Sequence, residues 1–198
     1  IFNNKDITKK DIYKQYQQLL NEDQIEIVVC GDFDENQITK QILDKLNFKD
    51  RNNEIETFYV IDSNDYGNVK EEKNYSQTNI AILYSTGISI TDNLYPTLKV
   101  CNGIFGQLPS SFLFQVVREQ HSLCYSISSN LISYDGACIV TTGIEKENVD
   151  MTLNLIDEQL KKCQNGEFSD EMIDTTKRML VNALLSSLDE MSSIVGYN

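Results

Sequence analysis

The segment between Leu123 and Ile144 constrains the fold most strongly, because its pattern predicts two strands joined by a tight turn. Apolar residues alternate along residues 123–133, and this places Leu123, Tyr125, Ile127 and Leu131 on one face. Residues 134–136, with the sequence Tyr-Asp-Gly, are typical of a hairpin turn, and residues 137–144 then return as the partner strand. A hairpin pairs its strands antiparallel. We therefore expect an α+β fold, a mostly antiparallel sheet with helices packed on one face, rather than a doubly wound parallel sheet.

Three further strands are predicted from short runs rich in β-branched or aromatic residues, at residues 25–30, 57–61 and 78–85. Helices are predicted where apolar residues recur at helical spacing. The first follows a capping box formed by Thr8 and Asp11, and the second follows Asp34 as its N-cap.

Four more helices are expected in the second half of the chain. The first runs from residue 91 or 92 to about residue 105, where Gly103, Gly106 and Pro109 are expected to break it, and the next covers residues 112–120. A long amphipathic helix follows from residue 149, with its apolar stripe on Val149, Leu153, Ile156 and Leu160, and it stops at Gly166. Ser169 is expected to cap the last helix, whose stripe is Ile173, Leu180, Leu184 and Leu188.

Composition excludes two classes of partner. The chain has 198 residues with 17 Lys and Arg against 30 Asp and Glu, a net charge of −13. That charge repels phosphate backbones, and no basic stripe offsets it, so we expect no nucleic-acid partner. No stretch approaches the roughly 18 apolar residues that span a bilayer, so we expect no membrane partner either.

The histidine and cysteine content limits the metal and nucleophile chemistry available to this chain. His121 is the single histidine, so a zinc site that needs two imidazoles cannot be completed, and we expect no metal or cofactor in this chain. We expect His121 itself to lie on the solvent side of a helix C-terminus. The five cysteines form no Cys-x-x-Cys pair, and most are expected to be small buried residues in a reducing compartment, which favours a cytoplasmic location.

Arg118 and Tyr125 are the candidate site residues. Arg118 ends an apolar helix face, and Tyr125 follows seven positions later at the start of a strand. A guanidinium provides a rigid fork of donors, and a phenol can donate one directed hydrogen bond to a peptide carbonyl or an oxyanion. The alternative is that Arg118 forms a surface pair with an acid such as Glu119, while Tyr125 packs in the core with Leu123 and Ile127.

The segment around these residues carries a family pattern. Residues 105–114 read Phe-Gly-Gln-Leu-Pro-Ser-Ser-Phe-Leu-Phe, and Val-Arg-Glu at 117–119 and Leu-Cys-Tyr at 123–125 follow. The chain resembles the pitrilysin family of inverted-motif zinc peptidases, which includes insulin-degrading enzyme and the mitochondrial processing peptidases. Residues 28–34 and Gln77 add to the resemblance. Three positions depart from the family pattern: Phe112 stands where Arg is frequent, Gln120 where Lys is usual, and Ser122 where Gly is usual.

The resemblance implies which half of such a peptidase this chain represents. The family's His-x-x-Glu-His zinc motif, which belongs to the amino-terminal half, is missing, whereas the Arg/Tyr pair of the carboxy-terminal half is present. We therefore expect residues 1–198 to be one zinc-less, carboxy-terminal-type domain and a piece of a longer protein. Arg118 and Tyr125 would contact a peptide or unfolded polypeptide. A complementary half-domain or subunit would hold the zinc and complete the active site.

Two other interpretations remain open. One is a non-catalytic scaffold or binding module on the same fold. The other is an unrelated α+β domain whose similarity to the family arose by chance.

Overall fold

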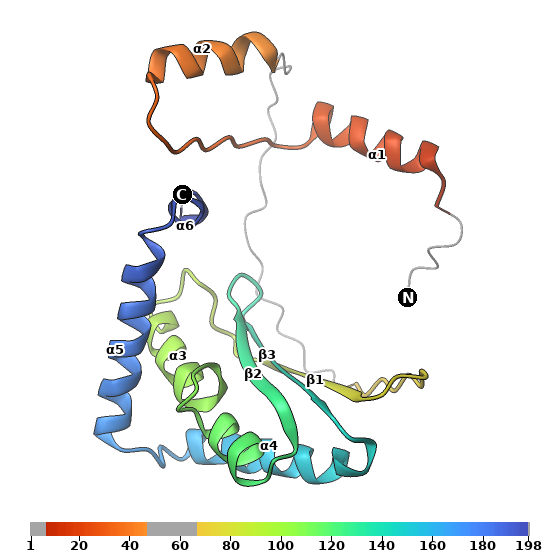
Figure 1. Cartoon of the computed structure of the whole chain (residues 1–198), viewed down its shortest axis with the longest axis vertical. Helices are drawn as coiled ribbons and strands as arrows, with labels where there is room; N and C mark the ends of the chain where they lie inside the picture. Colours follow the sequence, from red (N-terminus) through yellow and green to blue (C-terminus); the bar gives the residue numbers. More distant parts are fainter. Residues whose placement is uncertain (1–6, 47–66, 198) are drawn as a thin grey trace. The chain divides into compact units, whose positions relative to one another are not determined.

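The computed structural model describes residues 7–46 and 67–197, and it divides into two compact units (Figure 1). The first unit consists of Ile1–Thr57 and Leu185–Asn198, and the second of Phe58–Leu184. The two units are described separately below. Within the described ranges, no helix has the length and apolar character needed to cross a membrane.

The first unit begins with two helices whose starts were predicted correctly. Helix α1 (Lys9–Glu22) opens on a capping box in which the Thr8 amide donates to Asp11 Oδ2 at 2.8 Å and the Asp11 amide donates to Thr8 Oγ1 at 3.4 Å. Helix α2 (Glu35–Lys45) opens on Asp34, whose carboxylate accepts from the Gln37 amide at 2.8 Å. A short helix α6 (Met191–Tyr197), which the sequence did not predict, ends this unit.

The strand expected at residues 25–30 was predicted wrongly. These residues form no ladder with any strand of the described chain, and Ile27, Val28 and Val29 are 46%, 39% and 42% exposed. β-branched composition favours extended backbone, but a strand also needs a hydrogen-bonded neighbour, which composition does not supply. The strand expected at residues 57–61 lies outside the described residues.

The second unit contains the sheet, which confirms the α+β fold class. Strands β1 (Thr78–Ser85), β2 (Cys124–Ile132) and β3 (Ala137–Ile144) pair antiparallel in the order β1-β3-β2 (Figure 1). The predicted hairpin joins β2 to β3, and its turn contains Gly136 with φ of 62°. Glycine adopts this left-handed conformation without a steric penalty.

The remaining elements of this unit are mostly helical. They are α3 (Tyr95–Asn102), the π-helical segments η2 (Gly103–Gln107) and η3 (Phe114–Gln120), the 3₁₀ turn η4 (Lys146–Asn148), α4 (Val149–Gln164) and α5 (Asp170–Ser187). Helix α3 begins later than expected because Asp92 is used in a preceding turn, where its carboxylate accepts from the Leu94 amide at 2.7 Å. Ser169 caps α5 as predicted, by accepting from the Met172 amide at 3.2 Å.

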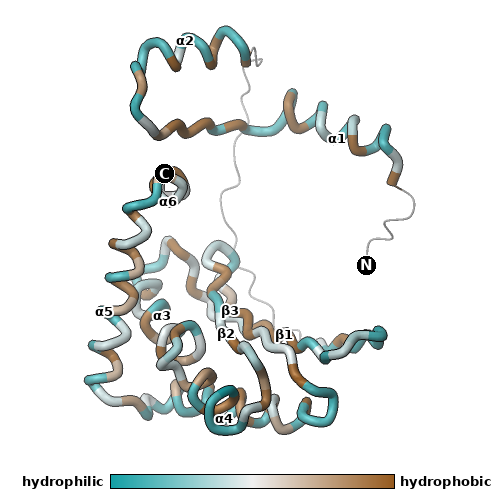
Figure 2. Tube along the Cα trace, viewed as in Figure 1, coloured by the Kyte–Doolittle hydropathy of each residue, from teal (hydrophilic) through white to brown (hydrophobic). Residues whose placement is uncertain are grey.

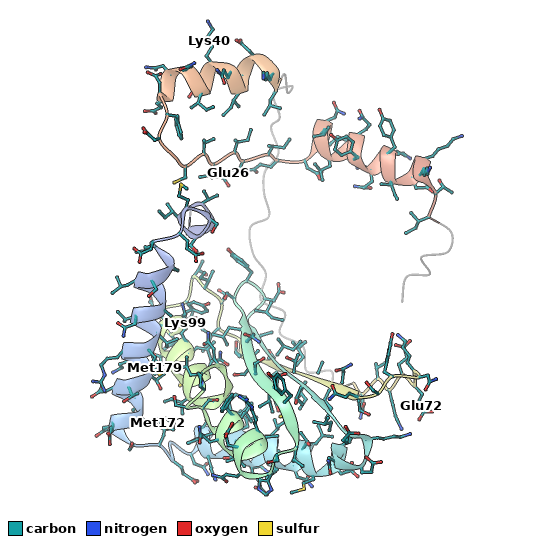
Figure 3. All side chains as sticks on the ribbon, in the orientation of Figure 1. Glu26, Lys40, Glu72, Lys99, Met172 and Met179 are labelled. Carbon is teal, nitrogen blue, oxygen red and sulfur yellow. The ribbon has the colours of Figure 1, made fainter. Side chains whose placement is uncertain are left out.

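The core lies between one face of the sheet and the helices. Figure 2 shows hydrophobic residues recurring along the strands and along α3. The buried cluster draws on η2, η3, β2, β3 and α4, and consists of Phe105, Leu113, Val117, Ile127, Val140 and Ile156. On α4 the buried row is Thr152, Ile156 and Gln159, whereas Leu153, expected in the stripe, is 38% exposed.

A buried polar cluster joins α3 to the sheet. The Asn102 side-chain oxygen accepts from Ser129 Oγ at 2.6 Å and from Cys138 Sγ at 3.5 Å. Its amide nitrogen donates to Gln107 Oε1 at 3.2 Å and to the Ser129 carbonyl at 3.3 Å. Because Asn102 is buried and all its polar atoms have partners, it fixes the end of α3 against β2.

The expectation that Gly103 and Gly106 break the helix was wrong. Both lie inside η2, and the helical path continues to Gln107. A Cβ at Gly103 would lie 2.7 Å from Thr176 Cγ2, and one at Gly106 would lie 2.6 Å from Leu113 Cδ1. The glycines are therefore required for close packing within the helix rather than for a turn.

Candidate functional site

The candidate site begins at η3, which is preceded by a short α-helical start at residues 112–113. Ser111 is fully buried and its hydroxyl accepts from the Phe114 amide at 3.4 Å. Leu113 and Val117, one turn apart, are both 0% exposed and anchor the segment in the core. Arg118 follows Val117 directly, so it emerges at the border of the core with its side chain one-third exposed (33%).

The end of η3 turns sharply into β2. The His121 amide donates to the Val116 carbonyl at 3.1 Å, and the Ser122 and Leu123 amides donate to the Arg118 and Val117 carbonyls at 3.0 and 3.1 Å. Ser122 makes this turn with φ of 51°, in the left-handed region that favours glycine. This conformation explains why glycine is usual at this position of the family pattern. Ser122 has a Cβ, so it adopts the same conformation at an energetic cost.

A β-bulge then sets the direction of Tyr125. Cys124 pairs with Ile144 and Ile127 pairs with Thr142, so two residues of β2 oppose one residue of β3. The Thr142 hydroxyl donates to the Ser126 carbonyl at 2.9 Å, which satisfies a backbone acceptor inside the bulge.

The bulge overturns the predicted face of Tyr125. Tyr125 is 85% exposed, whereas Ile127 is 5% exposed, so the two residues do not share a face. The strict alternation assumed from the sequence fails because the inserted residue shifts the period by one. The alternative interpretation, a core tyrosine, is wrong as well.

The structure brings Arg118 and Tyr125 together. The Arg118 Cζ atom lies 5.6 Å from the centroid of the Tyr125 ring and 4.3 Å from the centroid of the Phe114 ring. Both distances are in the cation–π range. Phe114 was not singled out from the sequence, although its position one turn before Arg118 could have indicated the contact.

Arg118 also forms the surface pair that the alternative interpretation proposed. Its Nε lies 3.6 Å from Glu119 Oε1, and the Glu119 side chain is 52% exposed. A solvent-exposed pair of this kind contributes about 0–1 kcal/mol. The pair engages Nε, so it is compatible with a second role for the terminal nitrogens of the guanidinium.

His121 and the five cysteines are the other residues of this chain suited to metal or nucleophile chemistry. His121 is exposed at the end of η3, as expected. Burial raises the pKa of Cys138 and of Cys163 to about 11, so both thiols are protonated and weakly nucleophilic at neutral pH. Over the described ranges, no group of three or more His, Cys, Asp or Glu residues could hold a metal ion.

The burial expected for the cysteines holds only in part. Cys138 is buried, Cys101, Cys124 and Cys163 are half-buried, and Cys30 is exposed. All five are free thiols.

Comparison with known proteins places these features in a family context. A family model described as the peptidase M16 inactive domain matches residues 6–180. The Bacillus subtilis protein named "Probable inactive metalloprotease YmfF" is 35% identical over 185 residues, which is 93% of this chain and 43% of that protein.

Solved structures agree with that match. A conserved protein from Enterococcus faecalis is 32% identical, with a TM-score of 0.79 over 97% of this chain and 45% of its own. A peptidase M16 inactive domain from Pseudomonas fluorescens has a TM-score of 0.54 at 23% identity, over 61% of this chain and 29% of its own, and supports the fold. The chain spans less than half the length of the relatives it matches.

Proposed function

Because this chain belongs to the inactive-domain family of the M16 peptidases, the pitrilysin family that its sequence resembles, we propose that it binds peptide and does not cleave it. In this proposal the chain pairs with another M16-type domain, in the same parent protein or in a partner chain. That second domain supplies the zinc chemistry, since one histidine among the 198 residues of this chain does not make a zinc site.

The observation that carries the proposal is the approach of Arg118 to Tyr125. The guanidinium carbon is 5.6 Å from an aromatic ring that is itself 85% exposed, so cation and phenol meet at the solvent boundary of the sheet. The in-plane N–H groups of the guanidinium and the phenol O–H are the donors that hold carbonyl oxygens of an extended peptide. The same donors can stabilise an oxyanion when a second domain performs the chemistry.

Peptide binding by the chain itself tests this proposal. The probe is a fluorescein-labelled, unstructured neutral peptide blocked at both ends, and the readout is fluorescence anisotropy. Arg118→Ala is expected to weaken binding about 10-fold or more, because it removes charge-assisted donors. Arg178→Ala is the matched control: Arg178 is an exposed arginine on α5 that contacts Thr175, and its loss should leave binding unchanged. Equal affinity of the Arg118 and Arg178 variants would contradict a role for Arg118.

Metal content and hydrolysis provide a second test. Elemental analysis of the purified chain should find far less than one zinc per chain, and added zinc should not produce peptide cleavage. Chelator-sensitive cleavage by a clean preparation would show that the chain is not the zinc-less half.

A second candidate function is a scaffold that holds an M16-type partner without touching peptide. It is favoured by the name of the Bacillus subtilis relative, which describes that protein as probably inactive. A chain that binds no peptide but still associates with an M16-type domain would support this function.

A further inference from the structure

Residues 113–118, at the start of η3 and just before it, form two rows with different environments. Leu113 and Val117 form one row, one turn apart, and are fully buried in the core cluster. Phe114 and Arg118 form the neighbouring row, also one turn apart, and both are half-buried at the edge of that core. Phe114 is not a member of the buried cluster, so its ring does not serve mainly to fill the core.

The Phe114 ring is the nearer of the two aromatic contacts of Arg118. The guanidinium carbon lies 4.3 Å from the Phe114 centroid and 5.6 Å from the Tyr125 centroid. Tyr125 is 85% exposed, whereas Phe114 is half-buried on the same helix as the arginine. Of the two rings in contact with the guanidinium, that of Phe114 is therefore both the closer and the more buried.

We propose that Phe114 is a positioning residue that holds the Arg118 guanidinium in one orientation for ligand contact, an inference that rests on the proposed function. A ring stacked on the face of a guanidinium uses none of its N–H donors, which all lie in the guanidinium plane. The ring contact therefore fixes the orientation of the guanidinium, while the N–H groups at the guanidinium edge stay available to carbonyl oxygens. A pre-oriented side chain loses less conformational entropy on binding than a mobile one.

The ion pair with Glu119 does not replace this role. That pair has an N–O distance of 3.6 Å between side chains that are 33% and 52% exposed, so salt screens it. The pair also occupies one of the in-plane nitrogens, Nε, which a ring contact leaves free.

The test combines an NMR signal of Arg118 with peptide binding. Three variants are compared with the wild-type chain: Phe114→Leu removes the ring, Phe114→Tyr retains a ring, and Phe112→Leu removes another half-buried ring from the same helical start. The Arg118 Nε–H resonance, assigned by its loss in Arg118→Ala, reports ring-current shift and side-chain mobility. The binding probe is the blocked fluorescein-labelled peptide.

In Phe114→Leu the Nε–H resonance should move toward the position of an exposed arginine and become mobile, and the peptide Kd should rise about three- to fivefold. Phe114→Tyr and Phe112→Leu should retain the wild-type signal and bind within about twofold of wild type. An Arg118 signal that is unchanged in Phe114→Leu overturns the inference. If Arg118→Ala binds peptide as well as wild type, the proposed function fails, whereas the NMR signal still decides whether Phe114 orients Arg118.

Discussion

The segments η2 and η3 are both π-helical, yet four residues of η2 are buried and only Val117 is buried in η3. η2 contains Gly103 and Gly106, the buried Phe105, and no charged residue. η3 contains Arg118 and Glu119, and its last turn reaches solvent. The two segments are close in sequence and lie on the same side of the sheet, since both contribute to the core cluster.

The difference shows that the same π-helical backbone can serve close packing in η2 and expose a charged side chain in η3. In η2 the absence of side chains at two positions lets Thr176, Leu113 and Ser129 approach the helix closely. In η3 the only buried residue is Val117, and the neighbouring row holds Arg118 with its guanidinium carbon 4.3 Å from the centroid of the Phe114 ring. π-helical turns are rare and are frequently found at functional sites. Substitutions should therefore cost stability at η2 and affect binding at η3.

The largest effect is expected for Gly106→Ala. The new Cβ would lie 2.6 Å from Leu113 Cδ1 and 2.7 Å from Ser129 Oγ, and both neighbours are 0% exposed and cannot move aside freely. Overpacking of this kind costs about 1–3 kcal/mol, and we expect the upper end of that range. Urea denaturation monitored by circular dichroism measures the change in the free energy of unfolding.

Gly196→Ala is the control for this substitution. Gly196 also lies in a helix, α6, but a Cβ there meets no atom within 4 Å. Alanine is the better helix former, so this variant should be neutral or more stable by up to about 1 kcal/mol. Equal destabilisation by both substitutions would contradict the packing role of η2.

Asn102→Ala should have the next largest effect. Asn102 accepts from Ser129 Oγ and donates to Gln107 Oε1, so alanine leaves buried polar atoms without partners and opens a small cavity at the start of η2. We expect a loss of about 2 kcal/mol in unfolding free energy. Asn130→Ala, an exposed asparagine on β2, should change stability by no more than about 0.5 kcal/mol.

The sequence predicted most of what local patterns determine. The hairpin, both capped helices of the first unit and the strand at residues 78–85 were all placed correctly, because each depends on side chains near one another in the chain. The resemblance to the pitrilysin family was confirmed as well, since its pattern lies in a continuous segment.

The errors arose where tertiary contacts decide the structure. Gly103 and Gly106 were expected to end a helix, but their neighbours Thr176, Leu113 and Ser129 explain their presence inside it. Tyr125 was predicted to share a face with Leu123 and Ile127, because the bulge that turns it outward depends on the pairing of β2 with β3 and cannot be seen in the sequence. The contact between Phe114 and Arg118 was missed because the spacing of one helical turn places two side chains on one side of a helix but does not show that they touch.

Thr142→Val tests the corner between η3 and β2. The substitution keeps the shape of a side chain that is only 6% exposed but removes the hydroxyl that donates to the Ser126 carbonyl inside the bulge. A lost hydrogen bond to a backbone acceptor costs about 1 kcal/mol, less than the changes at η2 because solvent is close. The matched control is Thr141→Val, at the exposed residue next to Thr142. It should lower the free energy of unfolding by less than about 0.5 kcal/mol. A cost above that of Asn102→Ala would reverse the ranking of the two regions.

Ser122→Gly is expected to have the smallest effect and the opposite sign. Ser122 adopts φ of 51° at the end of η3, a conformation that costs a residue with a Cβ about 1 kcal/mol and costs glycine nothing. Glycine also increases the entropy of the unfolded chain, so the net gain in unfolding free energy should be about 0.5 kcal/mol. Ser126→Gly, on an exposed strand residue without positive φ, should instead destabilise the chain by about 0.5–1 kcal/mol. Thermal unfolding of the two variants distinguishes these signs. Loss of stability in both would mean that the turn out of η3 is held by the serine side chain rather than by its backbone conformation.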